Sequence, residues 1–346
     1  MNIIIIIIAL IGLATITKFI PSLILLTKFA YPNAKFSAIE ITYLKEKELL
    51  KLLELKNLMQ LKENVVSKDF IIKGETINEM QKSIDDSLAK IILMAKKDSP
   101  KKVRKFYDVY LEKIDADMLK KAIMNAIKER EIKEYAYSDE ISNIINKLKK
   151  AEKEEIEKIL REHGFHILLD MSLNEIEREI DRRIIEKIIA TPLPKSCNKA
   201  KEKFAKILID IINLKTIFRG KHYNFEDIEK CILKNGWEIS EWQIKEFLKI
   251  DAIPEIISLL EGTSYFPELR QAIAEFEEEG VIALEKALDR HLIKAVRQIA
   301  NEYPLTIGPG IRFIVEKEYE ARNLKIIIKA IGEGLQEEAK KLLVMQ

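Results

Sequence analysis

The amino-acid sequence predicts an all-α protein built from three similar helical units, with a hydrophobic segment in front of them. Two observations carry this prediction. After residue 28, apolar residues recur at spacings of three and four, as in Ile141, Ile144, Ile145 and Leu148, which gives each helix one apolar face. A pattern of Asp, proline and Leu-Lys also recurs three times, and self-similarity at a regular period marks an internally repeated architecture.

The first 28 residues form the hydrophobic segment. Every residue from Ile3 to Thr17 is apolar, Gly or Thr, and the apolar character resumes after Lys18. A helix needs about 20 such residues to cross a bilayer, and a lysine can extend its amine to the interface. We therefore expect an N-terminal transmembrane helix within residues 1–28 that contacts membrane lipid through residues 3–27. Basic residues follow this segment rather than precede it, which favours a retained anchor and a body on the cytoplasmic side; a cleaved signal peptide and a misassigned start codon are the alternatives.

The repeated pattern has the same order in each copy: an Asp, a proline break, and an acidic residue four positions before Leu-Lys. The copies are Asp85, Pro100, Asp115 and Leu119-Lys120; Asp181, Pro192, Pro194, Asp210 and Leu214-Lys215; and Asp289, Pro304, Glu320 and Leu324-Lys325. From the Asp to the Leu of Leu-Lys runs roughly 34, 33 and 35 residues, so the copies keep step. We expect helical repeats at residues 29–135, 136–235 and 236–346.

Within each copy, the prolines predict two helices. A helix normally cannot continue through the residue before proline, so each break ends an Asp-bearing helix of about four turns, and the second helix carries Leu-Lys. Between the copies, the charged segment from Leu148 to Arg161 has Glu and Lys at spacings of four, including Glu154 and Lys158, which favours one exposed helix.

The polar residues of the pattern have two interpretations. The acidic residue and the Leu four positions later share a helix face, whereas the Lys stands about 100° round, so that Leu packs inward and the polar pair meets a neighbouring helix or solvent. One interpretation is helix-pair packing and capping. The other is a shared surface around an approximate threefold axis, since three copies of one surface favour a ring or funnel.

The composition limits the function. The 346 residues include 58 basic and 56 acidic side chains, a balance that does not indicate a nucleic-acid partner. The two cysteines, Cys197 and Cys231, cannot form the disulfide framework of a secreted protein, and we expect both to be free.

Several segments together resemble the C subunit of archaeal-type rotary ATP synthases, whose family includes the d subunit of vacuolar ATPases. The matching segments are Tyr303 to Pro309, Glu316 to Lys329, Phe29 to Lys35, Asn213 to His222 and Leu260 to Tyr265. Asn213 and Asn323, each directly before Leu-Lys, belong to the matching pattern. The first copy departs from it, because Met118 stands where the family often has Asn and Pro32 falls inside an opening helix.

The resemblance implies a noncatalytic adapter in a rotary motor, shaped as a pseudo-threefold funnel of three similar helical domains. It implies seating on the cytoplasmic face of the membrane ring of proteolipid subunits, with the D and F subunits of the central stalk as further partners and with no cofactor or small-molecule substrate. A few desolvated aromatic or Arg residues usually dominate such interfaces. The candidates on the matched segments are Arg219, Tyr319 and Arg322, each of which has internal packing as its alternative, most of all Tyr319.

The sequence contains no recognisable catalytic motif. Gly220-Lys221 is followed by His222 and has no glycine five residues earlier, so the phosphate-binding loop pattern is missing. His163 and His166 lack the arrangement of a zinc protease, and no metal site is expected there. Two other classes stay open. A membrane-anchored helical repeat scaffold unrelated to the motor predicts an open array, and a membrane-tethered hydrolase predicts a polar cleft with perturbed ionisable groups.

Overall fold

The computed structural model describes residues 20, 23–39, 44–65, 67 and 69–345, and its regular elements are all helices, which confirms the all-α prediction. The helices are a stretch over residues 23–38, α2 (Glu46–Leu53), α3 (Leu58–Asn64), α4 (Ile77–Asp98), α5 (Arg104–Ile114), α6 (Ala116–Ile127), α7 (Asp139–Leu148), α8 (Ile156–Glu162), α9 (Leu173–Ala190), α10 (Lys195–His222), α11 (Glu241–Lys249), α12 (Ile253–Ser258), α13 (Phe266–Gln271), α14 (Ile273–Glu279), α15 (Val281–Glu302), α16 (Gly308–Glu333) and α17 (Gln336–Lys340), with the 3-10 turns η1 (Lys101–Val103), η2 (Lys153–Glu155) and η3 (Ile228–Cys231).

The proline breaks fall where the sequence predicts them. Helices α4, α9 and α15 each end two residues before a proline, at Asp98, Ala190 and Glu302. They contain 22, 18 and 22 residues, which makes them one to two turns longer than predicted. The second helices carry Leu-Lys as expected, but in the first copy the second helix is divided at Asp115 into α5 and α6.

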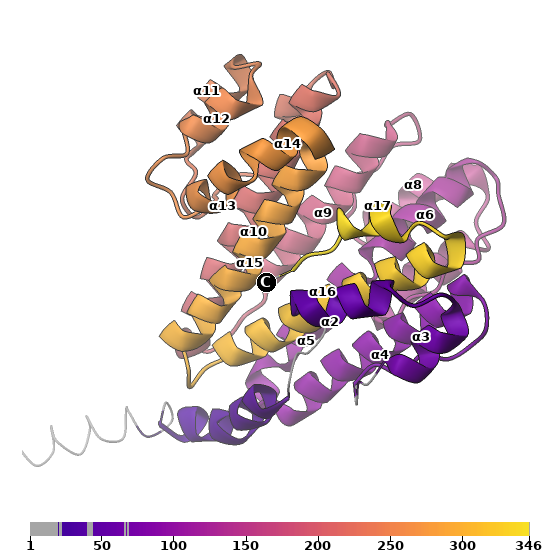
Figure 1. The fold of residues 1–346 in the computed structure, drawn as a ribbon, viewed down its shortest axis with the longest axis vertical. Helices are drawn as coiled ribbons and strands as arrows, with labels where there is room; N and C mark the ends of the chain where they lie inside the picture. Colours follow the sequence, from indigo (N-terminus) through magenta and orange to yellow (C-terminus); the bar gives the residue numbers. More distant parts are fainter. Residues whose placement is uncertain (1–19, 21–22, 40–43, 66, 68, 346) are drawn as a thin grey trace, which may run out of the picture.

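The long helices form a closed series of contacts. Helix α4 packs on α5, both α5 and α6 pack on α9, and the series continues through α10, α15 and α16. Helix α16 then packs on α4, which brings the third copy against the first. Figure 1 shows this juxtaposition, with the yellow C-terminal helices beside the indigo and purple helices α2 to α4.

Side chains near the proline turns fill the space between the helices. Phe106 of α5 packs edge-on against Phe204 of α10 at 6.4 Å between ring centroids, and the Tyr110 ring lies 6.3 Å from the same phenylalanine. The neighbouring Tyr107 leaves no room on α16, because a Cβ added to Gly310 would lie 2.2 Å from the tyrosine hydroxyl. These rings form a closely packed aromatic layer near the proline turns, with contacts among all three copies. We call this end of the bundle the proline end.

The helix over residues 23–38 attaches to the proline end of the bundle. The side-chain amide of Asn33 donates to the carbonyl oxygens of Pro304 and Thr306 at 2.8 and 3.0 Å. Phe36 stacks on Phe313 of α16 with 4.8 Å between ring centroids. The helix continues through Pro32, and in Figure 1 it lies beside the turn from α15 to α16.

The predicted membrane anchor, residues 1–28, lies for the most part outside the described residues, since residues 1–19 and 21–22 are not among them. Of the helices in the described part of the chain, none combines the length and the apolar character that a bilayer crossing requires.

Two smaller predictions have different outcomes. The expectation of one exposed helix from Leu148 to Arg161 is wrong, because α7 ends at Leu148 and a separate α8 begins at Ile156. The chain turns between them so that Ile156 and Leu160 are buried and α8 packs on α7. Both cysteines are free, as expected, and both are buried.

Candidate functional site: a polar cavity lined by the repeated residues

The Asp and Lys residues of all three copies line one cavity of about 410 Å³. The six are Asp85, Lys120, Asp181, Lys215, Asp289 and Lys325. They lie 11 or more residues from the proline breaks along the sequence, and Phe106, Tyr110 and Phe204 lie between. The cavity is therefore separated from the proline end by packed side chains.

Each lysine forms an ion pair with the aspartate of the next copy rather than with its own. The Nζ atom of Lys120 lies 3.1 Å from an Asp181 oxygen, and that of Lys215 lies 2.6 Å from an Asp289 oxygen. Lys325 completes the series by returning to Asp85 of the first copy, at 2.7 Å. The three pairs thus link the first copy to the second, the second to the third, and the third to the first.

The Leu-Lys dipeptide explains this placement locally. Leu119, Leu214 and Leu324 are fully buried in the core. Consecutive residues on a helix are about 100° apart, so once the leucine faces the core, the following lysine is turned toward the neighbouring helix and the cavity. Burying each leucine contributes on the order of 2 kcal/mol and fixes the direction of its lysine.

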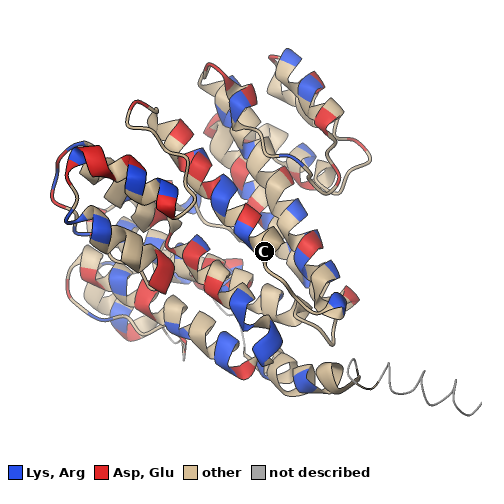
Figure 2. Ribbon diagram, turned by 180° about the vertical axis from the view of Figure 1, so that it is seen from behind, with Lys and Arg blue, Asp and Glu red and all other residues tan. Residues whose placement is uncertain are grey.

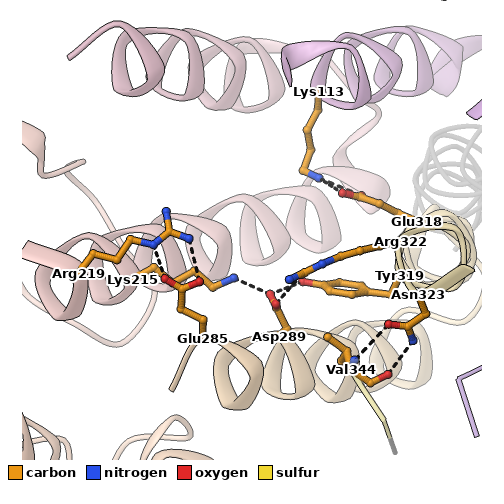
Figure 3. Close-up of polar contacts among 10 residues, drawn as sticks. All are labelled: Lys113, Lys215, Arg219, Glu285, Asp289, Glu318, Tyr319, Arg322, Asn323 and Val344. Carbon is orange, nitrogen blue, oxygen red and sulfur yellow. Dashed lines mark hydrogen bonds and ion pairs between the residues drawn. The ribbon is translucent and has the colours of Figure 1, made fainter. Parts of the chain in front are cut away.

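Asp289 has the largest set of donors in this series. Besides Lys215, it accepts hydrogen bonds from the Tyr319 hydroxyl and the Arg322 guanidinium, each at 2.6 Å (Figure 3). Burial raises the pKa of Asp289, but Lys215, Arg322 and the hydrogen bonds outweigh it, so the pKa lies below its usual range. The pKa of Tyr319 lies well above its usual value because of burial and the adjacent Asp289. Asp289 is therefore ionised and held from two sides, by α10 and α16.

The pair between the first and second copies is less well satisfied. Burial raises the pKa of Asp181, and the single contact with Lys120 offsets this only in part. Burial lowers the pKa of Lys120, but Asp181 and Asp117 together raise it above its usual value. The three lysine–aspartate pairs between copies, which we call joints, thus consist of the same residue types but differ in electrostatic strength.

In the second and third copies, the residue before Leu-Lys binds the chain that follows the second helix. The Asn213 side chain accepts from the Leu233 backbone N–H and donates to its carbonyl, both at 2.8 Å. Asn323 holds Val344 in the same way, at 3.1 and 2.8 Å (Figure 3). Met118 has no amide with which to do this, which gives a physical meaning to the departure of the first copy from the pattern.

The acidic residues four positions before the leucines have a related role in two copies. The Asp115 carboxylate accepts from the backbone N–H groups of Tyr137 and Ser138, and Asp210 accepts from Trp237 and Glu238. Each carboxylate therefore holds the start of the following unit. In the third copy, Glu320 instead accepts from Lys317 at 2.7 Å.

The three residues predicted to face a partner are all engaged inside the chain. Tyr319 is buried against Asp289, so within this chain its side chain packs internally. Arg219 forms a forked contact with Glu285, and Arg322 reaches Asp289, but their side chains remain 50% and 44% exposed (Figure 3). A role for Arg219 and Arg322 at an interface stays a prediction.

Other residues in the cavity wall do not belong to the recurring Asp and Leu-Lys pattern. Lys113 of α5 forms an ion pair with Glu318 of α16 at 2.6 Å, which adds a second link between the first and third copies (Figure 3). The hydroxyl of Tyr110 donates to the same Glu318. Lys113 and Glu318 stand two residues before Asp115 and Glu320, but the residue type at this position does not recur, so the internal repeat could not identify them.

The chemistry of this cavity is that of charge pairing. Its aspartates are engaged with lysine, arginine or backbone donors, and in the described part of the chain no three His, Cys, Asp or Glu residues gather as metal ligands. These contacts hold helices from different copies at fixed separations. The fold and site therefore define an all-helical protein in which the helices that carry the recurring Asp and Leu-Lys residues are joined by ion pairs.

Comparison with known proteins identifies the family. The family model for the ATP synthase (C/AC39) subunit matches residues 32–341, and the chain belongs to this family of noncatalytic subunits. The resemblance predicted from the sequence is confirmed.

Individual relatives agree with this assignment. The C subunit of the A-type ATP synthase from Methanocaldococcus jannaschii is 31% identical, over 92% of this chain and 87% of that protein. The corresponding C subunits from Thermococcus onnurineus and Methanothermobacter thermautotrophicus are 29% and 27% identical, and the alignments cover 92% and 93% of this chain and 90% and 89% of theirs.

Proposed function

We propose that this chain is the central-rotor adapter of an A-type ATP synthase. In this role it connects the proteolipid ring to the D and F subunits of the central stalk and transmits rotation between ion flow and ATP synthesis or hydrolysis. Its body lies on the cytoplasmic side of the cell membrane. The family and the names of the relatives support membership in the complex, and the arrangement of the repeats supports the mechanical role.

The observation that carries the proposal is the cyclic order of the ion pairs. Lys120, Lys215 and Lys325 each reach the aspartate of the next copy, and the last returns to the first. A part that transmits torque must resist shear between its units, and close-packed helix pairs are stiff. A closed series has no free end at which its units separate.

The same observation bears on the alternative of an open helical scaffold. An open array predicts a first and a last unit that do not meet, whereas α16 packs on α4 and Lys325 pairs with Asp85. These contacts favour a pseudo-threefold funnel of units at residues 29–135, 136–235 and 236–346. The cavity at its centre is the place where we expect the stalk.

The anchor is a further part of the proposal. Residues 3–27 insert into lipid, and we infer that they enter the lumen of the proteolipid ring and hold the funnel on its axis. The attachment of helix 23–38 to the proline end, through Asn33 and Phe36, supports a fixed direction for this segment. Deleting residues 1–27 should reduce retention of the body on purified membranes, and unchanged retention would contradict the anchor.

The test of the main proposal is a pull-down of the tagged chain from membranes solubilised in mild detergent. We expect the proteolipid ring, the D and F subunits of the stalk and the nucleotide-binding head subunits to co-purify. Isolation of the chain alone would reject the adapter and favour the scaffold.

A matched pair of variants connects the pull-down to the cyclic contacts. Lys325→Asp places two carboxylates at the closing joint and should weaken co-purification of the stalk subunits. The exchanged double variant Asp85→Lys/Lys325→Asp restores opposite charges there and should recover it. Equal loss in both variants would show that the joint has no part in holding the stalk.

A further inference from the structure

Helix 23–38 exposes large apolar side chains on its outward face. Leu23, Ile24 and Tyr31 are 63%, 49% and 69% exposed, whereas Phe29 and Phe36 are buried against the body. The exposed positions follow helical spacing, since residues 24 and 31 are two turns apart on one face. Such a face costs free energy in water and calls for a partner.

One lysine lies on this outward face, and further lysines continue onto the neighbouring turn. Lys28 lies on the exposed side of the same helix, and Lys35 ties the helix to the end of α4 through Asp98 at 2.7 Å. The turn that follows α4 carries Lys101 and Lys102, which are exposed. Figure 2 shows that basic residues gather where the N-terminal helix meets the body.

The charges of this region are not neutralised within the chain. Among the described residues, no acidic side chain pairs with Lys28, Lys97, Lys101 or Lys102, although the nearby Lys96 pairs with Asp108 and Lys35 with Asp98. A positive surface beside an apolar helix face matches the boundary between the phosphate groups and the hydrocarbon of a bilayer. A tyrosine on that face suits the same depth.

We propose that the outward face of helix 23–38, together with Lys28, Lys97, Lys101 and Lys102, forms a docking surface for the headgroup layer of an anionic phospholipid bilayer. This inference rests on the membrane location in the proposed function and adds which end of the bundle faces the membrane. Continuity supports lipid as the occupant, because the chain leading into this helix is apolar from residue 3 to residue 17. The cavity with its ion pairs then lies on the side of the aromatic layer that faces away from the membrane.

The test measures partition of the full chain between buffer and vesicles, either of phosphatidylcholine alone or of phosphatidylcholine mixed with phosphatidylglycerol. The wild type should prefer the anionic vesicles, and added salt should reduce this preference. Each lysine near an anionic surface is worth about a fivefold change in partition. The variant Lys97→Gln/Lys101→Gln/Lys102→Gln should therefore bind anionic vesicles about a hundredfold more weakly and neutral vesicles as before.

Two further variants make the result specific. Lys128→Gln/Lys149→Gln/Lys150→Gln removes the same charge from exposed turns after α6 and α7 and should leave the preference intact. Ile24→Ser/Tyr31→Ser should weaken binding to both kinds of vesicle. Absence of an anionic preference in the wild type, or equal losses in the two lysine variants, would overturn the proposal. A failure here would leave the co-purification result unaffected, so the two proposals are separable.

Discussion

Lys325, in α16 of the third copy, forms an ion pair with Asp85, in α4 of the first copy, at 2.7 Å across 240 residues of sequence. The contact is the closing member of a series in which each copy contacts the next. It links the third copy directly to the first.

Removing this closing contact should destabilise the fold measurably. The Asp85 side chain is only 12% exposed, so Lys325→Met leaves a largely buried carboxylate without its lysine, at a cost of about 2 kcal/mol. Urea unfolding checks the value, with exposed Lys329→Met as the control. A double-mutant cycle with Asp85→Asn should show a coupling energy above about 1 kcal/mol. Independent, additive effects would mean that the pair contributes nothing to closure.

The joints should differ in strength. Asp289→Asn leaves Lys215, Arg322 and Tyr319 without their carboxylate, and we expect a loss of about 3 kcal/mol. Asp181→Asn should cost no more than about 1 kcal/mol, because burial already favours the neutral form of Asp181. Chemical denaturation of the two variants at one pH compares them directly. Equal losses would contradict the unequal joints described above.

Glu320 should make stability depend on pH near neutrality. Burial raises its pKa to about 7, with partial compensation from Lys317, against the ordinary value of 4.5. Because the folded state holds this proton more tightly than the unfolded state, the contribution of Glu320 lowers stability as pH rises from about 4.5 to about 7.

Glu320→Gln should remove that decline, and unfolding curves measured at about pH 5 and about pH 8 test it. The matched control is Glu338→Gln at an exposed position. A decline of the same size in Glu320→Gln and the wild type would assign the dependence to other groups.

Gly310 should reject a methyl group. An added Cβ would lie 2.2 Å from the Tyr107 hydroxyl in a packed region, so Gly310→Ala should cost about 1 to 3 kcal/mol despite the better helix propensity of alanine. Tyr107→Phe removes the colliding oxygen, and the double variant should recover part of the stability. Thermal unfolding measures all three. If Gly310→Ala left the thermal stability unchanged, the side chains around Tyr107 would move apart more easily than their packing indicates.

Much of the local structure could be predicted from the sequence, because its causes lie within a few residues of each other. Prolines such as Pro100 and Pro304 end helices by removing a donor and restricting the preceding residue. Apolar spacing identified the buried faces, and the repeated Leu-Lys identified leucines that are in the core. The quoted segments also identified the family, which the comparison with known proteins supports.

Only the tertiary structure decided which charged residues meet. Lys120 belongs to the same copy as Asp85, yet it pairs with Asp181 of the next copy. The distance between a lysine and an aspartate depends on how their helices pack, not on their separation in the sequence. The same holds for Lys113 and Glu318, which no repeat connects. Helix formation and burial follow from short-range periodicity, whereas the contacts that close the series depend on how the completed helices turn toward one another.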